Sequence, residues 1–201
     1  YAGISGSHIL GRNSHGTAPI REREVTNADV EHVLDAACAV AIPADQRVLY
    51  KEPQEYIIDG QEDIRHPIGM SGVRLEANVH IVTGAVSAAQ NITKCVNRCG
   101  LQVDDLIPAA IASSKAILVQ DERELGVCLV DIGAGTTDIS IFTQGAIRHT
   151  PGYLPDIMAT ILDITGTPYP STWEGSPIEP LEGQSLASAF ARDTLERPPM
   201  F

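Results

Sequence analysis

The segment Asp131-Ile-Gly-Ala-Gly-Thr-Thr-Asp138 combines acidic, glycine and hydroxyl residues in an order that suits phosphate chemistry. It lies between two apolar runs, Val127–Val130 and Ile139–Phe142, which predict a pair of β-strands. Glycine in the turn lets backbone N–H groups approach an anion closely, because glycine carries no Cβ. Asp131, at the end of the first strand, can hold a Mg²⁺-bound water beside the phosphates. The segment therefore predicts one phosphate-binding hairpin.

The candidate nucleotide-binding residues lie in this turn and at its start: Asp131, Gly133, Ala134, Gly135, Thr136 and Thr137. Asp131 is also the candidate Mg²⁺ ligand, and the two threonines add hydroxyl donors. Asp138 is expected to tie the turn together by accepting backbone hydrogen bonds. The turn is neither a Walker A loop, since no Gly-Lys-Ser/Thr follows, nor a Rossmann loop, since it does not open a helix. A plain β-hairpin with glycine in its turn is the alternative interpretation.

The elements that position this hairpin begin with a helix near the N-terminus. Thr26 or Asn27 can cap it, and acidic residues follow in its first turn. Apolar residues then recur at helical spacing from Val30 to Ala41, and Pro43 ends the pattern. The sequence predicts an amphipathic helix here, preceded over the first sixteen residues by a strand and a turn.

Strands follow this helix. Residues 47–50 and 55–59 read as two short strands with Pro53 between them. From Val73 to Ile81 apolar and polar residues alternate, which predicts a strand buried on one face of an antiparallel sheet. A helix followed by strands, without βαβ alternation, predicts an α+β module that ends near Thr83.

The next part is richer in helix. Ser87 is expected to cap a helix that ends at Gly100. Residues 101–108 read as a short strand and residues 109–120 as a further helix. The uninterrupted apolar run Val127–Val130 predicts a strand in a sheet covered on both faces.

The overall composition narrows the function classes. The net charge of −12 argues against binding along a nucleic-acid backbone. No apolar run approaches the roughly 20 residues of a membrane span, so we expect a cytoplasmic chain. Four cysteines, at positions 38, 95, 99 and 128, are expected to be buried free thiols and no zinc site. The six histidines are scattered, and none is interpreted as catalytic.

The octet resembles the second phosphate loop of the superfamily of actin, sugar kinases and heat-shock chaperones. Strings along the rest of the chain resemble the FtsA family of bacterial cell-division proteins, over about residues 1–150. These strings are Ser5-Gly-Ser-His-Ile9, Pro53-Gln-Glu-Tyr56, Gly69-Met-Ser-Gly-Val-Arg74, Asp121-Glu-Arg-Glu-Leu-Gly126 and the two flanks of the loop, Gly126–Asp131 and Ile141–Thr150.

The resemblance implies an α/β protein with a partial actin-like (ribonuclease H-like) fold and an inserted α+β subdomain, called 1C in that family. Residues 1–83 would form this subdomain, and residues 84–150 parts of core subdomains 1A and 2A. The family binds ATP with Mg²⁺ between two lobes. The 201 residues are expected to lack the family's first phosphate loop, its adenosine loop, its membrane-binding helix and the half that recognises FtsZ, which leaves the ATP site incomplete.

Proline and glycine become frequent from Pro151 onward, and only Asp156–Ile164 reads as a helix within an otherwise irregular segment. Residues 151–201 resemble the C-terminal region of arylsulfatases, through Tyr153–Pro170, Pro180–Leu186 and Glu196–Phe201. The Cys-x-Pro-Ser-Arg motif of that family does not occur in this sequence, so sulfatase chemistry is not expected. We interpret the chain as two partial sequences joined near residues 150–152.

These resemblances lead to one expected function and two alternatives. The chain is expected to be a cell-division scaffold fragment, not an enzyme, that contacts FtsA protomers and other division proteins at the inner face of the cytoplasmic membrane. The first alternative is an ATP-binding or ATP-hydrolysing enzyme that uses the loop from Asp131 to Asp138. The second is a hydrolase fragment derived from a sulfatase. No contact with nucleic acid and no direct membrane segment is expected.

Overall fold

The structure is a computed structural model, and it describes residues 1–39, 42–133, 137–152, 154–173, 175–181 and 183–190. Its strands are β1 (Ala2–Ile4), β2 (Leu10–Pro19), β3 (Gln46–Ile58), β4 (Gln61–Ile64), β5 (Arg74–Ala85), β6 (Leu106–Pro108), β7 (Val127–Ile132), β8 (Thr137–Thr143), β9 (Ala146–Gly152), β10 (Thr172–Trp173) and β11 (Ser176–Pro177). Its helices are α1 (Asn27–Cys38), α2 (Val86–Arg98), α3 (Ala109–Ile117), α4 (Gln120–Leu125), α5 (Leu154–Thr165) and α6 (Ala187–Phe190).

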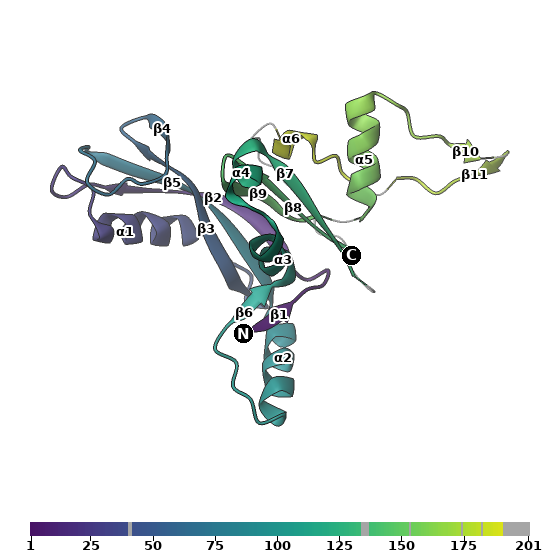
Figure 1. Cartoon of the computed structure of the whole chain (residues 1–201), viewed down its shortest axis with the longest axis horizontal. Helices are drawn as coiled ribbons and strands as arrows, with labels where there is room; N and C mark the ends of the chain where they lie inside the picture. Colours follow the sequence, from purple (N-terminus) through teal and green to yellow (C-terminus); the bar gives the residue numbers. More distant parts are fainter. Residues whose placement is uncertain (40–41, 134–136, 153, 174, 182, 191–201) are drawn as a thin grey trace.

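Four antiparallel strands and one helix form the unit at one end of the molecule (Figure 1). The strand order is β2-β5-β3-β4, and α1 covers one face. We call this the α+β unit. Its core joins the buried side of α1 to the apolar residues of the sheet, and includes Val25, Val33, Ala37, Tyr56, Ile58, Leu75, Ala77 and Val79.

The start of α1 agrees with the sequence prediction. Thr26 is the N-cap, and its Oγ1 accepts a hydrogen bond from the backbone N–H of Asp29 at 3.3 Å. The Asp29 carboxylate in turn accepts from the backbone N–H of Thr26 at 3.0 Å, which completes a reciprocal capping box. The hydrogen bonds from Thr26 lower the pKa of Asp29. The helix is thus fixed at its first turn by side chains that are local in sequence.

Gly16 explains how closely α1 packs against β2. A Cβ built at this position would lie 2.4 Å from the carbonyl oxygen of Val33 and 2.5 Å from the backbone nitrogen of Ala37. Next to it in the sheet face, Ser14 Oγ donates a hydrogen bond to the carbonyl of Ala37 at 2.6 Å. The absence of a side chain at Gly16 therefore allows backbone-to-backbone contact between helix and strand.

The prediction of two short strands at residues 47–50 and 55–59 was wrong. Residues 46–58 form one strand, β3, and not two strands separated by Pro53. The pairing of β3 with β5 shifts register between Pro53 and Glu55, and again between Val48 and Tyr50. Such irregularities allow a proline within a strand, because the ladder hydrogen bond that proline cannot donate is not required there. The short strand β4 was not predicted.

The alternating strand is confirmed as β5, with two corrections. Leu75, Ala77, Val79 and Ile81 are buried as predicted, but Val73 lies before the strand and is 68% exposed. His80, on the face expected to be polar and solvated, is only 1% exposed. The reason is that β9 lies over this part of the sheet, so the second face is also covered there.

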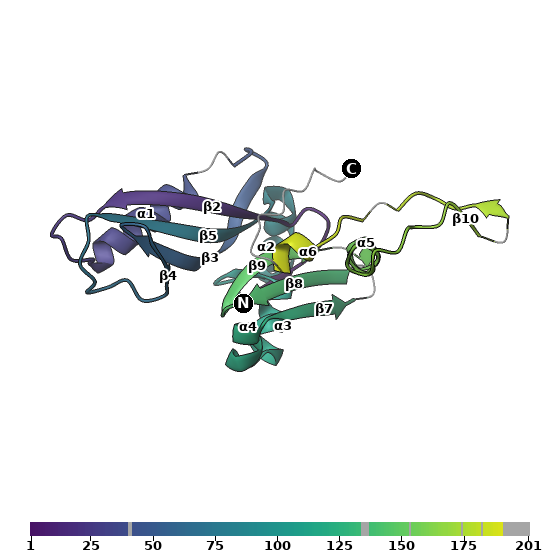
Figure 2. The ribbon, with the colours of Figure 1, turned by 90° about the horizontal axis from the view of Figure 1, so that it is seen from above.

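The candidate loop belongs to a separate three-stranded antiparallel sheet in the order β7-β8-β9. Strand β9 was missed by the sequence analysis, because Ala146–Gly152 has neither an apolar run nor clean alternation. Helices α3 and α4 lie beside this sheet (Figure 2). The apolar cluster between them contains Ile111, Phe142 and Ile147, with Val127 and Leu118 partly buried against it.

The helices between the two sheets partly agree with prediction. Helix α2 ends before Gly100, whose φ of +76° fits the predicted C′ position, but its N-cap is Ala85 and not Ser87. The predicted helix at 109–120 is two helices, because Leu118 has extended backbone between α3 and α4. Arg123 of α4 donates to the carbonyl of Ser114, which satisfies the end of α3.

The C-terminal segment contains the predicted helix and also packs on the rest of the chain. Helix α5 (Leu154–Thr165) matches the prediction for Asp156–Ile164. Leu186 and Ala189 are buried against Ile139 and Ile141 of β8. The two-stranded hairpin β10–β11 projects beyond α5, at the end of the molecule opposite α1 (Figures 1 and 2). Part of this segment therefore shares a core with the strand that carries the loop.

The strand pairs are mixed, which agrees with the predicted α/β class. Strands β1 and β6 pair in parallel, while the other sheets are antiparallel. No helix in the part of the chain that the structure describes is both long and apolar enough for a membrane span. The cysteine prediction was wrong in one respect, because Cys95, Cys99 and Cys128 are exposed; all four thiols are free.

Candidate functional site

The β7–β8 hairpin places the candidate residues at one end of the three-stranded sheet. Asp131 lies directly opposite Asp138, and Ile132 lies opposite Thr137. Gly133 follows β7 and is exposed. Three predicted site residues, Ala134, Gly135 and Thr136, lie outside the described residues. The described part thus brings Asp131, Gly133 and Thr137 together at the mouth of the turn.

Asp131 has a partner that the sequence analysis missed. Ser113 Oγ, on α3, donates a hydrogen bond to Asp131 Oδ2 at 2.6 Å. Asp131 is half-buried on the side of β7 that packs on α3. Ser113 gave no distinct signal in the sequence, since Ser114 and Lys115 follow it in α3 and serines in helices commonly bond to their own backbone. Ser113 therefore fixes one carboxylate oxygen, and the hydrogen bonds among the described residues give the other oxygen no donor.

The prediction that Asp138 ties the turn together involves the backbone of residues 134–136, which lie outside the described residues, so it stays a prediction. The expected backbone hydrogen bonds to its carboxylate are not found among the described residues. Burial raises the pKa of Asp138, and the negative charge of Asp131 on the neighbouring strand raises it further. Two like charges directly opposite in a hairpin repel each other. Without a bound cation, the two ionised carboxylates therefore destabilise the hairpin.

This pair of carboxylates fits the chemistry of a hard divalent cation. Mg²⁺ is bound by oxygen ligands and retains several waters, so one or two carboxylates suffice as protein ligands. A cation would also remove the repulsion between Asp131 and Asp138. Asp131 would be its ligand or the acceptor for its water, whereas Thr137 pairs with Ile132 and so has its side chain on the other face of the hairpin.

The other face of β7 contradicts the expectation of a sheet covered on both faces. Cys128, Val130 and Ile132 alternate with the half-buried residues and are exposed, Ile132 by 77%. Ile139 and Ile141 of β8 are buried on the same face, under Leu186 and Ala189. These C-terminal residues cover β8 but do not reach β7, which is the outer strand of the sheet.

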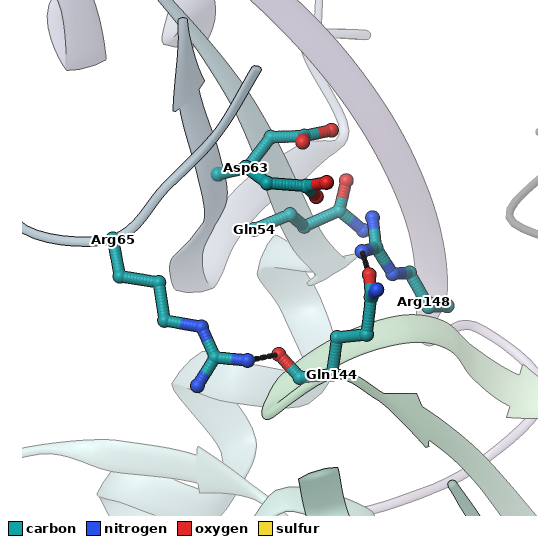
Figure 3. A pocket seen from close by; sticks show the side chains of 6 residues that line it. Gln54, Asp63, Arg65, Gln144 and Arg148 are labelled. Atoms are coloured by element: carbon teal, nitrogen blue, oxygen red, sulfur yellow. Dashed lines mark hydrogen bonds between the residues drawn. The ribbon is translucent and has the colours of Figure 1, made fainter. Parts of the chain in front are cut away.

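A polar pocket of about 160 Å³ lies where the three-stranded sheet meets the α+β unit (Figure 3). It is lined by Gln54, Glu55, Asp63, Arg65, Gln144 and Arg148. Arg65 forms an ion pair with Glu124, in which Nη2 and Oε2 are 2.7 Å apart, and this pairing lowers the pKa of Glu124. Arg65 also donates to the carbonyl of Gln144 in the β8–β9 turn.

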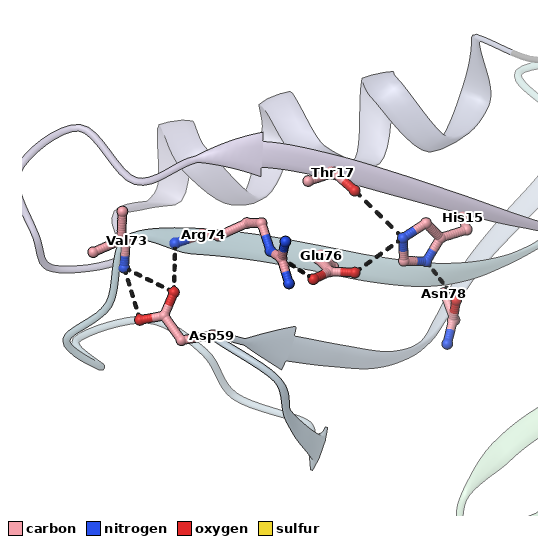
Figure 4. Close-up of polar contacts among 7 residues, drawn as sticks. All are labelled: His15, Thr17, Asp59, Val73, Arg74, Glu76 and Asn78. Atoms are coloured by element: carbon pink, nitrogen blue, oxygen red, sulfur yellow. Dashed lines mark hydrogen bonds and ion pairs between the residues drawn. The ribbon is translucent and has the colours of Figure 1, made fainter.

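The solvent face of the α+β unit carries a second polar group (Figure 4). Glu76 accepts from His15 at 3.1 Å and from Arg74 at 2.8 Å. Asp59 accepts from the backbone nitrogens of Val73 and Arg74, which holds the start of β5. These contacts satisfy one another and leave charged side chains at the surface of the sheet.

Residues 6–83 match the protein family described as the SHS2 domain inserted in FtsA. The match ends two residues before the end of β5, so it contains α1, β2, β3 and β4 entirely. The α+β unit is therefore the part of the chain that this family describes.

Curated relatives of the chain carry the name cell division protein FtsA. The protein of Pseudomonas aeruginosa is 67% identical over 150 residues, covering 75% of this chain and 36% of the relative. That of Neisseria meningitidis serogroup B is 52% identical over 148 residues, covering 74% of this chain and 36% of the relative. The Escherichia coli K12 protein is 48% identical over 196 residues, covering 96% of this chain and 46% of the relative. This chain thus spans less than half the length of these relatives.

The alignments differ in how much of the C-terminal segment they include. The alignment with the Escherichia coli protein covers 96% of the chain and so continues past residue 150, whereas that with the Pseudomonas protein covers 75%. The arylsulfatase resemblance of residues 151–201 and the join near residues 150–152 stay predictions.

Proposed function

We propose that the chain is part of an FtsA-like cell-division protein and acts as a scaffold, through protein contacts made by its α+β unit; the matches to FtsA proteins support this. The observation that carries this proposal is the completeness of that unit. Its helix is capped, its sheet is paired through four strands, and its core is closed by residues of the same unit. Its partners are FtsA protomers and other division proteins.

At the nucleotide loop, by contrast, the described residues provide the ends of the β7–β8 hairpin and α3 beside it, but no facing lobe. Asp131, Gly133 and Thr137 stand at the end of a hairpin whose outer strand exposes Val130 and Ile132. An anion held from one side stays largely solvated, and a solvated contact contributes little binding energy. We infer that this chain by itself binds Mg·ATP weakly and is not an enzyme.

ATP binding is the second candidate function, and one arrangement favours it. Ser113 fixes the Asp131 carboxylate, and Asp138 adds a second negative charge opposite it. A preorganised pair of carboxylates is what a Mg²⁺-bound nucleotide needs at this end of a hairpin. In this alternative the chain is the Mg²⁺-binding part of an actin-like ATPase.

We also propose where the chain works in the cell and how its segments are divided. The chain works at the inner face of the cytoplasmic membrane at the division site, in company with partners that reach the membrane. Residues 1–83 correspond to the 1C subdomain, residues 84–150 to parts of an actin-like core, and residues 151–201 to a segment of arylsulfatase origin.

Charge reversals on the α+β unit test the scaffold proposal. Binding of the purified chain to the full-length FtsA of Pseudomonas aeruginosa is measured for R12E, E31K, D35K and E62K, all at exposed positions of β2, α1 and β4. Asp121→Lys and Glu179→Lys, exposed on α4 and near the C-terminus, are the matched controls.

We expect at least one of the four reversals to weaken binding by about tenfold or more, since charge reversal in an interface is costly. The two controls should stay within about twofold of the unmodified chain. Binding that responds only to the controls, or to none of the six changes, would contradict a contact surface on the α+β unit.

A further inference from the structure

Strand β9 lies against the face of the four-stranded sheet opposite α1, and amide side chains join the two. Gln54 Nε2, from β3, donates to the carbonyl of Ile147 at 2.7 Å and to Asn13 Oδ1 at 3.1 Å. Asn13 Nδ2, from β2, donates to the carbonyl of Arg148 at 3.3 Å. His80 Nδ1, from β5, bonds to Asn13 Oδ1 at 2.6 Å. Three strands of the α+β unit thus converge on two adjacent carbonyls of β9.

These carbonyls belong to an irregular point of the three-stranded sheet. Phe142 pairs with Ile147, whereas the preceding Ile141 pairs with His149, so Arg148 is an extra residue in β9. This is a β-bulge, which bends a strand and redirects a side chain. The Arg148 side chain is buried and donates to Thr143 Oγ1 at 3.3 Å and to Gln144 Oε1 at 3.4 Å. The bulge is therefore held on its backbone side by the α+β unit and on its side-chain side by the β8–β9 turn.

Apolar packing and one exposed ion pair reinforce the same junction. Tyr50 of β3 packs with the cluster of Phe142 and Ile147, the two residues that pair across β8 and β9. Arg65, just beyond β4, reaches Glu124 and the carbonyl of Gln144. The end of β8 farther from the nucleotide loop, with the adjoining part of β9, is thus tied to the α+β unit in three ways: by amide side chains, by an aromatic contact and by Arg65.

We propose that this junction, made by Asn13, Gln54, His80 and Arg65 against the bulge at Arg148, couples the loop hairpin to the α+β unit. The structural reason is that β8 begins at Thr137 of the loop and ends at the turn that the junction holds. A displacement of the hairpin at its loop end is carried along β8, and the junction passes it to the sheet that carries the proposed partner contacts. The biological role of this coupling rests on the proposed scaffold function, whereas the physical coupling itself does not depend on it.

Hydrogen exchange of backbone amides in the whole chain tests the coupling without nucleotide or partner. Gln54→Met keeps the length of the side chain and removes both donors, which leaves the Ile147 carbonyl without this bond. Gln61→Met makes the same chemical change on exposed β4 and is the matched control. We expect amides of β8 and β9 to exchange about tenfold faster in Gln54→Met, with amides of α1 within about twofold of the unmodified chain.

A reciprocal measurement separates coupling from simple loosening of β9. Asp138→Asn removes one charge of the loop pair, and linkage requires that its effect also reach the other side of the junction. Amides of β3 near Gln54 should exchange about twofold or more slower in Asp138→Asn, and this difference should vanish in the Gln54→Met background. Equal change of all amides, including those of α1, or no response of β3 to Asp138→Asn would overturn the proposal.

A second variant covers the case in which Gln54→Met does not fold. Arg65→Gln alters an exposed side chain that is 43% accessible, so the fold should survive it. It should accelerate exchange in the β8–β9 turn and reduce the response of β3 to Asp138→Asn, and absence of both effects overturns the coupling. If the unmodified chain does not bind full-length FtsA but the variants show the expected exchange pattern, the scaffold function alone is contradicted.

Discussion

At the residue scale, the facing pair Asp131 and Asp138 sets the electrostatics of the loop. Burial and the charge of Asp131 raise the pKa of Asp138, so the folded chain holds a proton on Asp138 more tightly than the unfolded chain does. The contribution to stability is therefore largest below the ordinary carboxyl pKa of 3.8 and is lost as the pH rises through the raised value. At neutral pH the ionised pair costs stability.

Asp138→Asn should therefore stabilise the chain at pH 7, by roughly 0.2–1 kcal/mol for a like-charge pair across two strands. The gain should disappear well below the ordinary carboxyl pKa of 3.8, at about pH 3, where Asp138 is protonated in both states. Urea unfolding at the two pH values measures the difference, with exposed Asp121→Asn as control. A variant less stable than the unmodified chain at pH 7 would mean that Asp138 makes a favourable contact instead.

Individual residues of the site could be predicted only where they belong to a short sequence motif. Asp131 and Thr137 lie at the mouth of the hairpin as the octet predicts. Ser113 and Asp131 are eighteen residues apart, and their contact depends on how α3 packs on β7, which no local pattern encodes. Likewise, His80 reads as a solvated strand residue until β9 covers it.

At the element scale, the contact of α1 with β2 depends on Gly16. Gly16→Ala should destabilise the chain by about 1–3 kcal/mol, because the new Cβ meets backbone atoms that cannot turn aside. Gly3→Ala is the matched control, since a Cβ there meets nothing within 4 Å. Chemical denaturation of both variants checks this; equal stability of the two would show that helix and strand can separate at no cost.

Elements with strong local signals were predicted well, and those shaped by tertiary contacts were not. Helix α1 and strand β5 have a cap and a clean alternation, respectively, and both occur, although α1 ends at Cys38 and β5 begins after Val73. The break between α3 and α4 is stabilised by Arg123 bonding to Ser114, and the bulged strand β9 is held by side chains of another sheet. Such elements follow from partners distant in sequence, so periodicity does not indicate them.

At the scale of the whole molecule, the C-terminal segment contributes to the sheet that carries the loop. Leu186 is 2% exposed and packs with Ile139 and Ile141, which precede it by more than forty residues. Leu186→Ala should lower the free energy of unfolding by about 2–5 kcal/mol through lost burial and the cavity left behind. Ile164→Ala, at a position 67% exposed, should change it by less than about 0.5 kcal/mol. Similar small effects in both variants would indicate that the segment folds apart from the sheet.

The division into residues 1–83, 84–150 and 151–201 stays a prediction, and the sequence analysis treated residues after 150 as largely irregular. The buried contact of Leu186 with β8 could not be predicted, because it joins an isolated leucine in a proline-rich stretch to a distant strand. The junction of β9 with the four-stranded sheet was hidden for the same reason.

We propose that the α+β unit, and not the nucleotide loop, makes the contacts through which this chain acts. The most direct measurement is the Kd of the whole chain for full-length FtsA of Pseudomonas aeruginosa, compared with the Kd of Asp131→Ala under the same conditions. We predict that Asp131→Ala keeps saturable binding, with a Kd changed by less than about threefold, because Asp131 lies outside the α+β unit and acts on it only through the junction with β9. Absence of saturable binding, or its loss in Asp131→Ala, would contradict the claim.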